Sequence, residues 1–176
     1  YEITYGDWSS DVCSSDLTLV QRGDATMLVV DSHGEGAALV DRLHDAEIAA
    51  ELVPFEYLAG AMRNVDAVLI EALACGPDAA LCVGGSRAVL DVARAHGKEA
   101  TLVAGVGTRM PEPLWRGMLG ALALDDWRSG LDVIEAGLFA RVVGPTGVTI
   151  GGANEIAKSL VAECAPATEL LRRSVI

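Results

Sequence analysis

Basic residues are scarce in this sequence, and lysine is the scarcest of them. Lysine and arginine together number 13 against 25 aspartates and glutamates, which gives a formal net charge of −12 at pH 7. Only Lys98 and Lys158 are lysines. A surface of negative charge repels phosphate backbones and anionic headgroups. The balance therefore disfavours nucleic acid and the membrane surface as partners of this protein.

Long apolar runs and paired cysteines are also missing. No run of apolar residues approaches the length that a membrane-spanning helix needs. The cysteines are Cys13, Cys75, Cys82 and Cys164, and none of them has the Cys-x-x-Cys spacing of a metal or redox site. Cys75, Cys82 and Cys164 stand among apolar residues, which predicts buried free thiols in a reducing cytoplasm. We accordingly expect no metal ion and no cofactor.

The first residues have neither helical nor strand periodicity. Residues 6–17, with the sequence GDWSSDVCSSDL, resemble the translation of a sequencing-library adapter. We therefore expect residues 1–17, Cys13 included, to be a non-native segment outside the fold. The alternative is a natural polar leader, although a secretory signal would need a basic start and an apolar stretch. On this interpretation the native domain is residues 18–176, shortened at its N-terminus.

Apolar segments of strand length alternate with helical patterns through most of the chain. Strands are expected near residues 26–30, 50–54, 68–70 and 100–106, and helices near residues 37–45, 55–64 and 86–96. Strands that alternate with helices at this spacing form βαβ units, in which the strands are parallel and the crossovers right-handed. The sequence thus predicts an α/β domain with a Rossmann-like parallel sheet flanked by helices.

The stretch from residue 67 to residue 96 organises this pattern. A buried strand is followed by a turn at residues 76–78, by a short extended segment at residues 80–83, and by a glycine turn that opens a helix. Gly84-Gly85-Ser86 forms that turn, and its serine is the predicted N-cap. Free backbone N–H groups and the positive end of the helix dipole suit a phosphate there. The alternative is a tight strand-to-helix connection without a ligand.

Beyond Pro113 the pattern is weaker. Residues 114–124 fit either a helix or the remnant of a hairpin. The segments expected after it are an extended one at residues 131–134, a strand with its turn at 140–147, and short helices at 153–163 and 168–175.

Several short motifs stand at the ends of the predicted strands and at the starts of the helices. Asp31-Ser32-His33 ends one strand and Glu35-Gly36 opens the next helix. They are followed in order by Val65-Asp66, Gly85-Ser86, Thr108-Arg109 and Asp132-Val133. This series resembles the C-terminal, Rossmann-like domain of the eIF2B alpha/beta/delta family, which has Glu-Ser-Arg-Pro, Glu-Gly, Val-Asp, Gly-Thr, Thr/Ser-Lys and a closing Asp-Val segment in these places. The order and spacing of these motifs indicate the family more than any one of them does.

The family includes isomerases of ribose 1,5-bisphosphate and of methylthioribose 1-phosphate, and the sequence departs from them at the residues that carry their chemistry. Their catalytic Asp ends a Gly-Ala-Asp motif, and Leu73 stands at that position here. Their Asn-Lys pair falls at Cys82-Val83. Isomerisation moves a proton between adjacent carbons, which leucine cannot do. Glu71, two residues earlier, is the candidate acid/base; otherwise it is a carboxylate that accepts a backbone hydrogen bond.

The residues nominated for a phosphorylated ligand are Gly84, Gly85, Ser86, His33 and Arg109. Arg109 follows a strand at the edge where ligands bind in open parallel sheets. Two functions are implied by the resemblance. The first is a non-catalytic, eIF2B-like regulatory or ligand-sensing subunit that assembles with itself or with related subunits. The second is a sugar-phosphate isomerase with rearranged acid/base residues, and the departures from the isomerase motifs favour the first.

Overall fold

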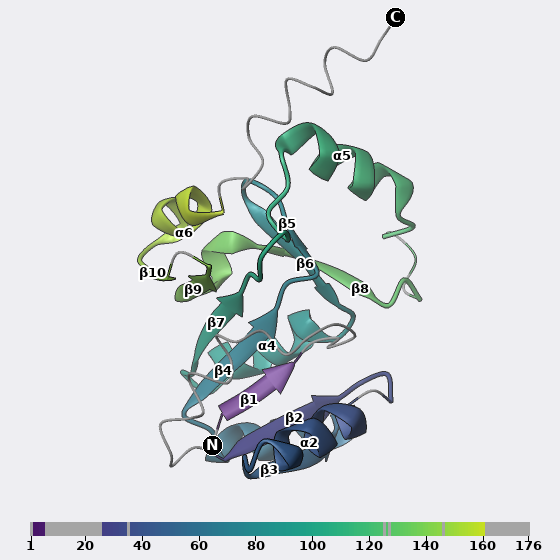
Figure 1. Ribbon diagram of the computed structural model, residues 1–176, viewed down its shortest axis with the longest axis vertical. Helices are drawn as coiled ribbons and strands as arrows, with labels where there is room; N and C mark the ends of the chain where they lie inside the picture. The colour runs from purple at the N-terminus through teal and green to yellow at the C-terminus, as the bar shows by residue number, and fades with distance from the viewer. Residues whose placement is uncertain are drawn as a thin grey trace, which may run out of the picture.

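A computed structural model describes residues 2–5, 26–34, 36–124, 126, 128–145 and 147–160, and Figure 1 shows the arrangement of their elements. The strands are β1 (Glu2–Tyr5), β2 (Met27–Asp31), β3 (Ala50–Pro54), β4 (Ala67–Glu71), β5 (Ala74–Cys75), β6 (Ala79–Val83), β7 (Glu99–Val103), β8 (Leu131–Glu135), β9 (Arg141–Gly144) and β10 (Gly147–Ile150). The helices are α2 (Gly36–Asp45), α3 (Leu58–Ala61), α4 (Ser86–Ala95), α5 (Glu112–Ala121) and α6 (Ala153–Ser159), with 3-10 turns η1 (Phe55–Tyr57), η2 (Met62–Asn64) and η3 (Ala136–Leu138).

The main sheet has seven strands in the order β10-β9-β7-β4-β1-β2-β3. All neighbouring strands in it are parallel except β10, which forms an antiparallel hairpin with β9. The strands β2 and β4 are almost continuously buried, as expected for parallel strands covered on both faces. The predicted α/β class with a Rossmann-like parallel sheet is therefore confirmed.

The strand β1 lies in the interior of this sheet, and it corrects the expectation for the first residues. Its backbone pairs with β2 on one side and with β4 on the other, with Thr4 beside Val29 and Leu69. Parallel neighbours need a crossover of a dozen or more residues, and residues 6–26 supply that length between β1 and β2. The expectation that residues 1–17 stay outside the fold is thus wrong for Glu2–Tyr5.

Some predictions fall on residues that are not described. These are the adapter-like character of residues 6–17 and the helix at 168–175, together with Cys13 and Cys164.

Within the described residues, no helix is long and apolar enough to cross a membrane.

A second, antiparallel sheet of three strands in the order β5-β6-β8 was not expected. The predicted turn at residues 76–78 joins β5 to β6, and the Gly76 N–H donates to the Ala79 carbonyl at 2.8 Å. The extended segments near residues 80–83 and 131–134 pair with each other as β6 and β8. Between β7 and this last strand, residues 112–121 form the helix α5, which resolves the choice between helix and hairpin.

The two faces of the main sheet bury separate clusters. The larger cluster holds residues from β2, β4, β7 and β9 together with α3, α4 and α6, and it includes Leu90, Leu102 and Ile156 at 0% exposure. The smaller cluster packs Leu39 and Leu43 of α2 against the opposite face. The helices thus cover both faces of the sheet, and the carboxyl ends of the parallel strands meet at one edge.

Cys75 and Cys82 are buried free thiols, as the sequence predicted. Burial is the main cause that raises the pKa of the Cys82 thiol, with the neighbouring Cys75 and the negative charges of Asp132 and Glu71 acting in the same direction. Because the thiolate is the reactive form, this environment keeps Cys82 protonated and chemically inert.

A third cluster forms around Trp115 of α5, which is 4% exposed and packs against the small sheet. Gly76 lies directly on its indole ring, and a Cβ atom there would come within 2.4 Å of the ring atoms.

We expect Gly76→Ala to lower the free energy of unfolding by about 1–3 kcal/mol, because the ring has to move. Chemical denaturation measures this change.

The matched control for Gly76→Ala is Gly117→Ala in α5, the helix that carries Trp115. A Cβ at Gly117 meets nothing within 4 Å. Since glycine weakens a helix interior, this change should raise stability by about 0.5–1 kcal/mol. Equal effects of the two substitutions would contradict the contact between Gly76 and the indole.

Removal of residues 1–17 should abolish cooperative thermal unfolding, because β2 and β4 would lose the strand that joins them. A milder variant, Thr4→Pro, removes an N–H from an interior strand and should cost about 3 kcal/mol or more. Thr4→Val, which keeps a β-branched residue, serves as control. Circular dichroism follows the melts, and a truncated chain that melts within about 2–4 °C of the intact one would show that β1 is dispensable.

Candidate functional site

A cavity of about 440 Å³ opens beside the ends of β2 and β6. Its walls come from Ser32 and His33 after β2, Gly84 and Gly85 after β6, and the loop between residues 124 and 132. The loop after β2 leaves the carboxyl end of a parallel strand, which is the usual binding region of open α/β folds, whereas β6 belongs to the small antiparallel sheet. The structure thus brings together three of the residues nominated from the sequence: His33, Gly84 and Gly85.

The loop after β2 is held by its own polar side chains. The Asp31 carboxylate accepts hydrogen bonds from the backbone N–H groups of His33 at 3.2 Å and Gly34 at 2.6 Å. The Ser32 hydroxyl donates to the Gly84 carbonyl at 3.2 Å and lies 2.5 Å from Nδ1 of His33. The imidazole at the cavity wall is therefore linked to the glycine turn through a single serine.

The glycine turn differs from the prediction in its cap. Gly85, with φ of 102°, is the N-cap of α4, and Ser86 is the first residue inside the helix. The expectation that Ser86 caps the helix is wrong, because its side chain points into the core, where it is 0% exposed. The Ser86 hydroxyl has no hydrogen-bond partner among the described residues.

Asp132 of β8 occupies the N-terminus of α4, and the sequence analysis did not identify this role. Its Oδ2 accepts hydrogen bonds from the backbone N–H groups of Gly85 and Arg87, each at 2.9 Å. These are the donors that were expected to be free for a phosphate, so that expectation is wrong for Gly85. The resemblance placed Asp132 in a family motif, but residues 47 positions apart give no periodic signal of contact.

Gly84 meets the loop before β8 at very short range. Its N–H donates to the Gly130 carbonyl at 2.6 Å, and a Cβ atom on Gly84 would come within 2.6 Å of the Gly130 carbonyl carbon. Gly130 itself has φ of 66°, a conformation that favours glycine. The glycine at position 84 therefore permits two backbones to approach closely, which is a structural reason for its presence.

The cavity wall combines both signs of charge. Arg128 supplies a positive group and His33 an imidazole, while Asp126 and Asp132 supply negative groups. The Asp126 carboxylate also accepts a hydrogen bond from the Arg128 N–H at 3.0 Å, which shapes the loop. Such a lining suits a small polar ligand that carries an anionic group as well as hydroxyl groups.

Arg109 and Glu71 do not line this cavity. Arg109 lies in a backbone bridge to Cys75, where the chain runs beside β5. Glu71 ends β4 and is half-buried, close enough to Cys82 for its charge to raise the thiol pKa. Leu73, two residues after Glu71, is 36% exposed. Its backbone N–H donates to the Leu81 carbonyl at 2.8 Å.

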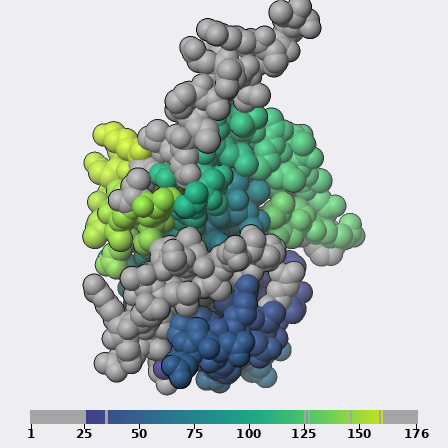
Figure 2. All heavy atoms as spheres, in the orientation of Figure 1, coloured from purple at the N-terminus to yellow at the C-terminus, as the bar shows by residue number. Residues whose placement is uncertain are grey.

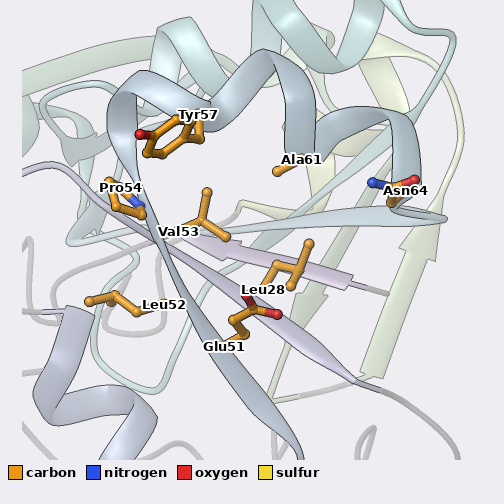
Figure 3. Close-up of a pocket in the computed structure, with 8 residues that line it drawn as sticks. All are labelled: Leu28, Glu51, Leu52, Val53, Pro54, Tyr57, Ala61 and Asn64. Atoms are coloured by element: carbon orange, nitrogen blue, oxygen red, sulfur yellow. The ribbon is translucent and has the colours of Figure 1, made fainter.

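A second cavity, of about 470 Å³, lies between β3 and α3 (Figure 3). Leu28 and Val53 of the sheet face Tyr57 and Ala61 across it, and Glu51 is the charged residue in its wall. None of the nominated site residues belongs to this wall. Among the described residues, no group of three or more His, Cys, Asp or Glu side chains is arranged to hold a metal ion.

The fold and the edge of the sheet that carries the first cavity define a Rossmann-like α/β domain. Solved structures of eIF2B subunits and of a related isomerase share this fold. The chain matches eIF2B beta from Chaetomium thermophilum with a TM-score of 0.62 and 18% identity, covering 91% of this chain and 47% of that one. It matches the translation initiation factor eIF-2B of Pyrococcus horikoshii with a TM-score of 0.69 and 16% identity, covering 85% and 58%.

The isomerase is 5-methylthioribose 1-phosphate isomerase from Pyrococcus horikoshii, with a TM-score of 0.67 and 16% identity over 90% of this chain and 53% of that one. No family model and no curated protein matches by sequence. The chain has the fold of the eIF2B-like family, which confirms the resemblance at that level. It spans about half the length of these structures.

We expect Asp132→Ala to lower the free energy of unfolding by about 1–3 kcal/mol, because the amides of Gly85 and Arg87 lose their acceptor. Asp132→Asn retains an acceptor oxygen and should cost less. Inorganic phosphate should then stabilise Asp132→Ala more than the unchanged protein, since the vacated helix end can accept an anion. Thermal melts with and without phosphate measure both effects. An alanine variant as stable as the original would contradict the role of this carboxylate.

Proposed function

We propose that this chain is a non-catalytic regulatory or ligand-sensing domain of the eIF2B type. The observation that carries the proposal is Leu73, which by resemblance stands where the isomerases have their catalytic Asp. The Asp132 carboxylate adds to it, because it already takes the N–H groups of Gly85 and Arg87 at the helix N-terminus. An internal acceptor that is already charged and well placed makes binding of a second anion at the same donors unfavourable.

The motif positions support the same conclusion. By resemblance, Leu73 stands where the isomerases have their catalytic Asp, and it has no group that can exchange a proton. Cys82 falls in the place of part of their substrate-binding pair, and it is buried with a raised pKa. Fold similarity to both eIF2B subunits and an isomerase is compatible with either function, so these side chains carry the distinction.

The proposed ligand is a phosphorylated small molecule in the cavity beside β2 and β6. His33 and the Gly84-Gly85 turn form part of that wall, and Arg128 adds a positive group that the sequence analysis did not nominate. Ser86 and Arg109, also nominated from the sequence, do not belong to the cavity wall. A phosphate would therefore be bound mainly by the side chains of His33 and Arg128 and not by the N–H groups of the helix.

The alternative function is a sugar-phosphate isomerase in which Glu71 acts as acid/base. The position of Glu71 at the carboxyl end of β4, half-buried and at the edge where ligands bind in such sheets, favours this second candidate. A partly buried carboxylate in such a place is a reasonable proton acceptor.

Partners and location belong to the same proposal. One structural neighbour is a tetrameric eIF2B-beta2-delta2 complex from C. thermophilum, and we propose that this chain also assembles, with itself or with related subunits. The buried free thiols of Cys75 and Cys82 are typical of a reducing compartment, which supports the cytoplasm.

The deciding experiment incubates the protein with ribose 1,5-bisphosphate or methylthioribose 1-phosphate and follows the ketose product by NMR. We expect saturable binding without turnover. His33→Ala should weaken binding by about tenfold or more, since a hydrogen bond to a charged group contributes about 1.5–3 kcal/mol. The control is His96→Ala, whose ring lies at the far end of α4 and bonds to the Val92 carbonyl. Turnover that Glu71→Gln abolishes would instead establish the isomerase.

A further inference from the structure

The second cavity, between β3 and α3, has no part in the proposed function, because its wall shares no residue with the wall of the first cavity (Figure 3). Its volume of about 470 Å³ is in the range of pockets that hold small molecules. Figure 2 shows the blue part of the chain, to which α2 and β3 belong, at the surface of the molecule. Glu51 and Tyr57 at the cavity are both exposed, so a ligand can enter from solvent.

The cavity exists because α3 presents a small side chain to the sheet at this point. Leu58 and Met62 are buried in one cluster with Val53 of the sheet. Ala61 packs against the same cluster and also lines the cavity. Its methyl group is too short to fill the space above Leu28, so the close packing of the core is interrupted there.

Glu51 brings a carboxylate to the floor of this cavity. Alternate residues of a strand face the same side of a sheet, so Glu51 points to the same face as Val53. The strand ladder pairs Glu51 with Leu28 of β2, and Figure 3 shows the carboxylate beside the Leu28 side chain. Leu28 and Val53 are each 7% exposed. An acidic side chain therefore borders the apolar floor of the cavity.

The Glu51 carboxylate has no hydrogen bond or ion pair with any described residue. Other exposed acidic side chains of the described chain, such as Asp91 and Glu99, are paired with arginine. No lysine, arginine or histidine is among the described residues that line the cavity. The net charge of −12 adds a field that attracts cations. The cavity thus offers a carboxylate that is available to a positively charged ligand.

Tyr57 forms the other side of the cavity. Figure 3 shows its ring on the far side of Val53 from Glu51, and 64% of this tyrosine is exposed. An aromatic ring over an apolar floor gives a flat contact surface for another ring or for a branched hydrocarbon. Asn64 adds an amide that can donate or accept a hydrogen bond. The wall therefore suits a molecule with one cationic end and one apolar end.

We propose that this cavity binds a small organic amine. The ammonium group pairs with the Glu51 carboxylate, and the aromatic or branched apolar body lies on Leu28 and Val53 against the ring of Tyr57. A hydrogen bond between an ammonium group and a carboxylate is charge-assisted, and it fixes which end of the ligand lies at Glu51. Burial of the apolar body supplies a favourable transfer free energy. The site is selective for charge at one end and tolerant of shape at the other.

Titration of the full chain with phenethylamine, followed by NMR of the ligand, tests the proposal. We expect saturable binding with a dissociation constant of about 1 mM or below. Phenethyl alcohol has the same ring and chain without the charge, and it should bind about tenfold more weakly, because it cannot form the charge-assisted hydrogen bond. Hydrocinnamate carries a negative charge, which Glu51 repels, and it should not bind measurably.

Variants of the wall separate charge recognition from apolar contact. Glu51→Gln keeps the size of the side chain and removes its charge, so it should weaken phenethylamine about tenfold and leave phenethyl alcohol unchanged. Glu56→Gln is the matched control, since it changes the net charge equally at an exposed residue of η1 outside the cavity wall. Tyr57→Ala should weaken the amine and the alcohol by the same factor.

Three results would overturn the proposal: equal affinity for the amine and the alcohol, amine binding that survives Glu51→Gln, or no saturable binding of the amine. Tighter binding of acetyl-lysinamide than of phenethylamine would also overturn it, and would indicate a lysine side chain of a partner protein instead. His33→Ala, which tests the first cavity, should leave the affinity for phenethylamine unchanged. Failure of one site is therefore recognised independently of the other.

Discussion

The candidate site depends on the hydrogen bonds that the Asp132 carboxylate accepts from the backbone of Gly85 and Arg87. This carboxylate reaches from β8 in the small sheet to the first turn of α4, where it accepts two backbone hydrogen bonds of 2.9 Å. A negative group at a helix N-terminus is favourable both through the dipole and through charge-assisted hydrogen bonds. The same strand follows the loop whose Gly130 carbonyl receives the Gly84 N–H. The small sheet, the helix and the cavity wall are thus fixed to one another.

This arrangement gives the glycine turn a structural purpose that its composition alone does not reveal. Gly84 allows the loop at Gly130 to come close, and Gly85 adopts the positive φ that starts the helix. The remaining polar groups of the cavity, His33 and Arg128 among them, stand on loops that the network holds in place. A cavity with mixed charge can bind a small ligand without providing the proton transfer of an isomerase.

Much of the sheet could be predicted because parallel strands covered on both faces are continuous apolar segments. The expected strand at residues 50–54 coincides with β3, and the helix expected at residues 37–45 differs from α2 by one residue. The small sheet was missed for a physical reason as well. Its strand β5 has two residues, too few for any periodic signal, and the partner of β6 is a strand far along the chain.

The sequence by itself determined the alternation of strands and helices from β2 to β7, the buried thiols and the edge of the sheet where ligands are expected, because each depends on local composition and spacing. The tertiary structure alone decided the membership of Glu2–Tyr5 in the sheet, the anion at the start of α4 and the absence of Ser86 and Arg109 from the cavity wall. These features arise from contacts between distant segments. A backbone N–H looks equally available in any sequence, and only the folded chain shows which carboxylate has already bound it.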